Sequence, residues 1–143
     1  IMIKYFFIVC LLIATSKTAA KKFEQAEQSR LNGAHELAIK LYEEASKSGN
    51  PLASHWAGTY YLDGVGVKQN SFKAHKFFLH AAQNGIDGSM IYLANMYLSG
   101  NGVSLDCKEA IYWLSKSFGK NIPKAWQQRL SDCENSKSNK PED

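Results

Sequence analysis

The 143-residue sequence is short of several features that would define its class directly. It has no apolar run of the roughly 20 residues that a membrane-spanning helix needs, no strong excess of one charge, and only three cysteines. One domain's length excludes a large multidomain enzyme. The net charge is only +4 and the basic residues are dispersed. Because nucleic-acid binding depends on clustered cationic side chains, we expect no nucleic-acid partner.

The N-terminal segment 1–20 differs in composition from the rest of the chain. Lys4 precedes an apolar run over 5–14, and small and polar residues follow as far as Ala20. This order is typical of a secretory signal peptide, and we expect cleavage after Ala20. Two alternatives are a buried N-terminal helix and an uncleaved membrane anchor. Cleavage would place the mature protein in the periplasm or outside the cell, without membrane contact.

The interior of the chain repeats with a period of 36 residues. A fixed period between about 20 and 50 residues indicates a stacked repeat fold. Within each unit, small and apolar residues recur at helical spacing, which predicts two helices per unit. When the segments that begin at Ala53 and Ser89 are superimposed, six pairs are identical: Tyr61/Tyr97, Leu62/Leu98, Gly64/Gly100, Gly66/Gly102, Val67/Val103 and Ala74/Ala110.

Glycine-rich segments at 63–67 and 99–103 separate the two helices of each unit. Their glycines permit the positive φ angles of a helix C-terminal turn, and the final valine of each segment is expected to pack into the core. A phosphate-binding loop is the alternative, but it needs a preceding strand and a following Lys-Ser/Thr pair, which are missing. We therefore interpret both segments as turns.

Shorter versions of the unit lie on both sides. Upstream, a first helix is predicted over about 23–31, and a second helix contains Ala38 and Tyr42, 36 residues before Ala74 and Phe78. Downstream, Pro123 is suited to the first turn of one more helix, over about 123–134. This helix has no partner and is expected to cap the stack. The polar tail 135–143 is expected to be disordered.

The run A-x3-[L/A]-[G/A]-x2-Y-x2-G-x-G-V, followed by [K/E]-A-x2-[F/W]-[F/L], resembles the Sel1-like repeat family. That family forms α/α solenoids related to tetratricopeptide repeats. The resemblance implies an all-α solenoid over 21–134, with Sel1-like units at 51–86 and 87–122 and a tetratricopeptide-like unit at about 23–50. Ala57, where the family usually has leucine, and Asn121, where it has glycine, depart from the pattern.

The solenoid arrangement brings two cysteines together. Cys107 opens the second helix of the second unit, and Cys133 lies near the end of the capping helix. Because consecutive helices run antiparallel, we expect these residues to form a disulfide, as export to an oxidising compartment permits. The alternative is a pair of unlinked thiols.

The first helices of stacked hairpins line an inner, concave wall. Aromatic side chains turned toward solvent on such a wall concentrate binding energy. The alternative is that aromatic residues such as Trp56 and Tyr60 pack against neighbouring helices. A helical wheel predicts that the binding wall consists of His55, Trp56, Thr59, Tyr60, Ile91, Tyr92, Asn95 and Met96.

No catalytic or metal-binding pattern stands out. The four histidines, His35, His55, His75 and His80, have no partners at metal-ligand spacing. Ser117 begins an S-x-x-K match, but it occupies a repeat position predicted to be small and buried, and no S-D-N or K-T-G motif accompanies it. We expect a chain that is not an enzyme and binds no cofactor and no metal.

The resemblance implies an adaptor or scaffold that binds another protein, and we expect it to act as a monomer. A periplasmic immunity protein that neutralises a toxin is one specific form of this function. The alternatives are an enzyme that hydrolyses cell-wall or β-lactam substrates, and a secreted effector that binds host proteins.

Overall fold

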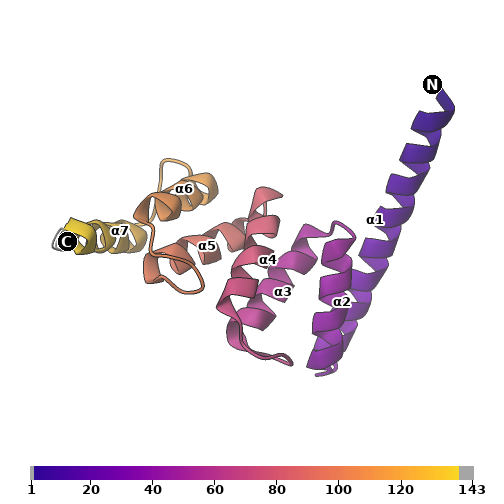
Figure 1. The fold of residues 1–143 in the computed structure, drawn as a ribbon, viewed down its shortest axis with the longest axis horizontal. Helices are drawn as coiled ribbons and strands as arrows, with labels where there is room; N and C mark the ends of the chain where they lie inside the picture. Colours follow the sequence, from indigo (N-terminus) through magenta and orange to yellow (C-terminus); the bar gives the residue numbers. More distant parts are fainter. Residues whose placement is uncertain (1, 139–143) are drawn as a thin grey trace.

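The computed structural model describes the backbone of residues 2–138 and the side chains of residues 14–136. This part of the chain contains seven helices and no strand, and each helix packs mainly against its neighbours in sequence. The stack extends in one direction, so the first and last helices lie at its opposite ends (Figure 1). The predicted all-α solenoid is confirmed. The helices are α1 (Met2–Leu31), α2 (His35–Lys47), α3 (Pro51–Asp63), α4 (Ser71–Gln83), α5 (Asp87–Ser99), α6 (Cys107–Phe118) and α7 (Lys124–Ser138).

Side-chain caps fix the starts of three helices. Asn50 accepts a hydrogen bond from the backbone N–H of Ala53, 3.0 Å away, at the start of α3. Asn70 caps α4 in the same way, and the Asp106 carboxylate caps α6. Each cap satisfies a backbone donor that has no partner within its own helix. Polar residues therefore fix where α3, α4 and α6 begin, whereas α2 and α5 follow Ala34 and Ile86 and have no side-chain cap.

The predicted glycine turns are confirmed. Gly64 and Gly100 end α3 and α5 in the left-handed conformation, with φ angles of 72° and 66°. A side chain at these positions would be strained, which is why glycine terminates these helices. Val67 and Val103 are partly buried against the core, as expected from the sequence.

Small and large side chains alternate in the core with the 36-residue period. Tyr42, Phe78 and Leu114 occupy equivalent positions on α2, α4 and α6, and all three are fully buried. Small residues opposite them allow close helix packing: a Cβ atom at Gly58 would lie 2.7 Å from the Phe78 ring. Burial of one large apolar side chain contributes about 1.5–3 kcal/mol, so these layers supply much of the fold's stability.

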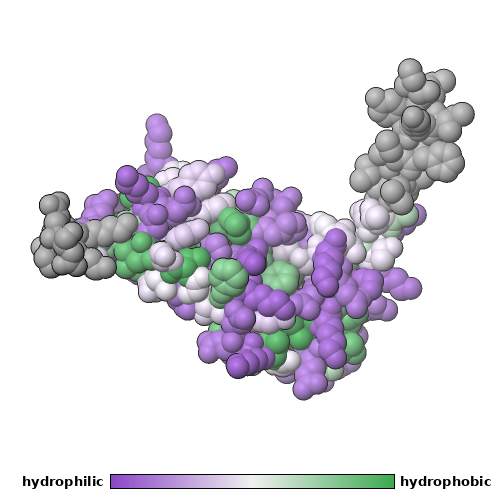
Figure 2. Space-filling model, viewed as in Figure 1, coloured by the Kyte–Doolittle hydropathy of each residue, from purple (hydrophilic) through white to green (hydrophobic). Residues whose placement is uncertain are grey.

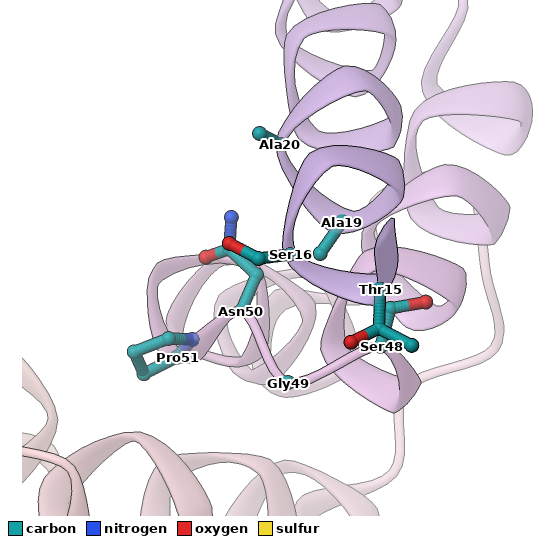
Figure 3. Close-up of a pocket in the computed structure, with 8 residues that line it drawn as sticks. All are labelled: Thr15, Ser16, Ala19, Ala20, Ser48, Gly49, Asn50 and Pro51. Carbon is teal, nitrogen blue, oxygen red and sulfur yellow. The ribbon is translucent and has the colours of Figure 1, made fainter. Parts of the chain in front are cut away.

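The two ends of the chain differ from expectation. The apolar N-terminal segment and the predicted first helix form one continuous helix, α1, whose N-terminal half projects beyond the stack (Figure 1). Ala19 is buried, and a hollow of about 420 Å³ separates this part of α1 from the α2–α3 turn (Figure 3). Cleavage after Ala20 stays a prediction. Among the described helices, none is long and apolar enough to cross a membrane.

At the other end, α7 continues to Ser138. The disorder predicted from residue 135 onward is therefore wrong for 135–138, and the remaining part of that prediction, 139–143, lies outside the described residues. The predicted disulfide is present: Cys107 at the start of α6 is bonded to Cys133 of α7, with Cα atoms 6.0 Å apart. The bond ties the capping helix to the last hairpin.

Candidate protein-binding wall

A row of aromatic rings runs along the first helices of the two Sel1-like units. Trp56 on α3 and Tyr92 on α5 are both partly exposed, and the ring of His55 contacts both of them. The centroid of the His55 ring lies 5.7 Å from that of Trp56 and 5.8 Å from that of Tyr92. The structure therefore joins three of the predicted wall residues into one continuous surface across two repeats.

Each exposed ring is supported by a buried ring from the preceding second helix. Tyr92 stacks on Phe78 with 4.5 Å between ring centroids, and Trp56 stacks on Tyr42 at 6.3 Å. The two pairs are related by the 36-residue period. One side of Trp56 and of Tyr92 therefore belongs to the core, while the rest remains accessible, and this packing fixes the orientation of the rings.

Two predicted wall residues are not accessible. Tyr60 is 5% exposed and Met96 is 1% exposed, so the expectation that they face solvent is wrong. The Tyr60 ring packs edge-on against Tyr42 at 5.6 Å, and its hydroxyl contacts Nδ1 of His35 at 3.2 Å. Tyr60 and Met96 are equivalent positions of the repeat. In both cases, packing of neighbouring helices covers the helix face that the helical wheel predicts to be exposed.

The remaining predicted residues, Thr59, Ile91 and Asn95, are partly exposed. The Thr59 hydroxyl donates to the backbone carbonyl of Trp56 in its own helix, at 2.8 Å. Asn95 Oδ1 accepts a hydrogen bond from Arg129 of α7, at 2.7 Å. The wall thus combines aromatic rings with small polar side chains. This composition is suited to binding the surface of another protein.

Two arginines at the ends of this row were missed by the sequence analysis. The Arg30 guanidinium lies 5.0 Å from the centroid of the Trp56 ring and pairs with Glu27 at 2.8 Å. Arg129 binds Asn95 and lies 4.7 Å from the centroid of the Trp126 ring. Arginine is enriched at protein interfaces. Both arginines lie on helices outside the two matching units, so the 36-residue pattern gave no signal for them.

Two serine–histidine pairs also escaped the sequence analysis. Ser54 Oγ lies 2.7 Å from His80 Nδ1, and Ser89 Oγ lies 2.8 Å from His55 Nδ1. A hydrogen-bonded serine and histidine can form a nucleophile and its base, but both serines are fully buried. A substrate has no access to their hydroxyls, so these pairs act as links between helices. Burial lowers the pKa of His55, which favours the neutral imidazole.

The Ser117 position also differs from expectation. Ser117 was predicted to be small and buried like Ala45 and Ala81, but it is partly exposed near the end of α6. Within the side chains that the structure describes, its hydroxyl has no hydrogen-bonded base, which a serine nucleophile requires. The same residues contain no group of three or more His, Cys, Asp or Glu side chains that could hold a metal ion.

Comparison with known proteins identifies the family. The Sel1 repeat model matches residues 32–50, 51–86 and 88–118, which together make up more than half of the chain. The protein belongs to the Sel1 repeat family. The first matched segment covers the second helix of the first unit, and the other two correspond closely to the predicted units 51–86 and 87–122.

Two similar curated proteins are named as regulators. An exopolysaccharide production negative regulator of Rhizobium leguminosarum bv. viciae is 31% identical over 111 residues, which cover 66% of this chain and 40% of that protein. Chitin synthase regulatory factor 3 of Schizosaccharomyces pombe is 27% identical over 89 residues, which cover 62% of this chain and 10% of that protein. The chain thus spans less than half the length of these relatives.

Two solved structures share the fold. A Sel1 repeat protein from Oxalobacter formigenes superimposes with a TM-score of 0.56 at 33% identity, covering 57% of this chain and 63% of that one. A protective antigen of uropathogenic Escherichia coli that displays an SLR fold gives a TM-score of 0.69 at 21% identity, covering 82% of this chain and 26% of that one. The latter likeness concerns the fold alone.

Proposed function

We propose that this Sel1 repeat protein is a non-enzymatic adaptor that binds another protein on the wall formed by α3 and α5. The proposal depends chiefly on the row in which His55 contacts both Trp56 and Tyr92. Rings held by a core on one side and open on the other lose little conformational freedom on binding, so they are effective anchors. The regulatory roles of the two similar curated proteins agree with an adaptor.

The wall favours a protein segment with apolar and hydrogen-bonding groups over a small molecule. The Trp56 indole N–H and the Tyr92 hydroxyl have no hydrogen-bond partner among the described residues, so they are free to bind acceptors of a partner. Arg30 and Arg129 add charged donors at the ends of the row. Export to the periplasm is a further part of this proposal, motivated by the N-terminal sequence and the disulfide. An immunity role there is its more specific form, and secretion as an effector that binds host proteins is the alternative.

Affinity capture with wall variants tests this function. Tagged protein is compared with Trp56→Ala/Tyr92→Ala, which removes both anchors, and we expect loss of the captured partners. Thr59→Arg is the second variant, because this side chain is partly exposed on α3 and does not belong to the core cluster. It should block the wall while the protein remains folded, as circular dichroism would show.

The matched control is Tyr112→Ala, which removes an aromatic side chain that is 48% exposed on α6, away from the wall. This variant should retain the partners. If the Thr59→Arg protein is folded and captures the same partners at the same level as the unsubstituted chain, the wall is not the binding site. Fractionation into periplasm, medium and cytoplasm tests the proposed export separately.

A further inference from the structure

We propose that the segment bound by the wall is rich in proline and adopts the polyproline II conformation. This inference deepens the proposed function and rests on it. It follows from the hydrogen-bonding groups of the wall, most of which are donors, and from the spacing of its aromatic rings. A proline-rich segment matches such a wall because it offers carbonyl acceptors and apolar rings but few N–H donors.

The two anchor rings of the wall present hydrogen-bond donors to solvent. Among the described side chains, the buried nitrogen and oxygen atoms without a hydrogen-bond partner are Arg30 Nε and Trp113 Nε1. Trp56 Nε1 and the Tyr92 hydroxyl also have no partner, but they are not among these buried atoms, so both reach solvent. An indole N–H can only donate, and a phenol hydroxyl can donate as well.

His55 and Asn95 add further donors. His55 Nδ1 lies 2.8 Å from the hydroxyl of Ser89, which is fully buried. Because a buried hydroxyl needs an acceptor, Ser89 donates to Nδ1, and the proton of the neutral imidazole is therefore on Nε2. Asn95 Oδ1 is occupied by the hydrogen bond from Arg129, at 2.7 Å. This bond leaves the N–H groups of the Asn95 amide for a partner.

The acceptors near the wall are few or already engaged. The Glu27 carboxylate pairs with Arg30 at 2.8 Å. The helices α3 and α5 contain one acidic residue each, Asp63 and Asp87, and both stand at helix ends rather than among the wall residues. The Thr59 hydroxyl, which donates within α3, remains as a neutral acceptor. The wall therefore matches a partner that brings acceptors with few donors.

Among peptide conformations, polyproline II satisfies this excess of donors. An α-helix uses its carbonyl groups internally, and an ordinary extended chain brings one N–H donor with each carbonyl. A polyproline II segment has no internal hydrogen bonds, and each proline in it removes one N–H. Its carbonyl groups are therefore free to accept hydrogen bonds from Trp56, Tyr92 and Asn95. The conformation is formed before binding, so little conformational freedom is lost.

The spacing of the rings agrees with this conformation. The centroids of Trp56 and Tyr92 lie 5.7 Å and 5.8 Å from that of the His55 ring between them. Prolines three residues apart lie on the same side of a polyproline II helix, about 9 Å apart, and two rings joined through His55 can be separated by that distance. On the face shown in Figure 2, hydrophobic residues form small patches among hydrophilic ones, which suits a narrow segment better than a broad apolar surface. We therefore expect a Pro-x-x-Pro pattern with one proline at each ring.

Binding of decaproline tests the inference. The full chain is titrated with decaproline, which forms polyproline II without internal N–H groups, and with an uncharged alanine–glutamine peptide of the same length. Two-dimensional ¹H–¹⁵N NMR follows the indole N–H signals, and Trp56→Phe assigns the signal of Trp56. Decaproline should move this signal downfield, while that of Trp113, whose Nε1 is buried, stays unchanged. The alanine–glutamine peptide should bind about tenfold more weakly.

Tyr92→Phe removes one donor and keeps the ring that stacks on Phe78. It should weaken the binding of decaproline about fivefold, because one hydrogen bond is lost. Tyr112→Phe is the matched control, since it removes a hydroxyl from a ring that is 48% exposed on α6. It should leave the affinity unchanged, and circular dichroism should show that both variants are folded.

Three results would overturn the inference: equal affinities for the two peptides, a shift at Trp113 without one at Trp56, or equal effects of Tyr92→Phe and Tyr112→Phe. Thr59→Arg separates this inference from the proposed function. Loss of partner capture in that variant, together with no binding of decaproline to the unsubstituted chain, would overturn the inference alone. Unchanged capture by a folded Thr59→Arg protein would overturn the proposed function and the inference with it.

Discussion

The rings of Phe78 and Tyr92 lie nearly parallel, at an interplanar angle of 4° and with 4.5 Å between their centroids. Phe78 is fully buried on α4, whereas Tyr92 is partly exposed on α5. The pair Tyr42 and Trp56 repeats this relationship one unit earlier. The binding wall and the core are thus two sides of the same aromatic layers, so a substitution on the wall also affects stability.

Tyr92→Ala is expected to lower the free energy of unfolding by about 3 kcal/mol, because it removes both buried area and ring stacking. Urea denaturation followed by circular dichroism measures the change. Tyr112→Ala removes the same side chain from an exposed site and should cost less than about 1 kcal/mol. Equal losses in the two variants would contradict the layered packing.

Removal of the disulfide should destabilise the C-terminal end of the stack. The bond between Cys107 and Cys133 closes a loop with a sequence separation of 26. On the chain-entropy estimate, Cys107→Ser/Cys133→Ser lowers the free energy of unfolding by about 3–4 kcal/mol. Unfolding of the unsubstituted protein with and without a reductant provides an independent comparison. A reduced protein as stable as the oxidised one would contradict this prediction.

Two glycines with similar backbone angles should respond differently to alanine. Gly33 and Gly66 have φ angles of 76° and 63°, but only at Gly66 would the added Cβ meet backbone atoms, 2.6 Å from the carbonyl carbon of His35. Gly33→Ala should cost about 1–2 kcal/mol from conformational strain alone. Gly66→Ala should cost more, because the α3–α4 loop must move away from α2. Thermal or urea unfolding ranks the two variants, and the reverse order would show that the loop does not pack there.

Stability should fall when the pH drops below the ordinary histidine range. Burial lowers the pKa of His55 and of His75, because desolvation disfavours the imidazolium. In the unfolded chain these residues have a pKa of about 6.5, so below that pH the unfolded state binds more protons. Their contribution to stability is complete above this value and is lost as the pH falls through the folded pKa.

Unfolding free energies measured between about pH 8 and pH 5 check this pH dependence. His75 Nε2 contacts the Tyr97 hydroxyl at 3.1 Å, and His55 Nδ1 is hydrogen-bonded to the Ser89 hydroxyl at 2.8 Å. Replacement of both histidines, as His55→Asn/His75→Phe, should flatten the pH dependence in this range. A double variant with an unchanged slope would assign the effect to other groups.

Much of the fold was predictable from local pattern. The identical pairs Gly64/Gly100 and Val67/Val103 located the turns, because a left-handed helix terminus needs glycine whatever surrounds it. The cysteine pair was predictable once the order of antiparallel helices was known. The end of α7 was not, because the polar residues after Glu134 gave no apolar pattern with which to place it.

The candidate site was predicted only in part. Helical periodicity correctly grouped Trp56 and Tyr92 on equivalent positions, and the structure connects them through His55. It could not show that neighbouring packing covers Tyr60 and Met96, since exposure depends on the angle at which one hairpin crosses the next.

The sequence by itself determined the period, the hairpins, the turns and the residues that share each helix face, because these depend on backbone preferences and on spacing within a single helix. Only the tertiary structure decided which part of each helix face is covered by neighbouring helices and which side chains from α1 and α7 reach the wall. It also decided which buried serines form hydrogen bonds with histidines. Those contacts join residues of different helices, and their geometry is set by how the layers stack.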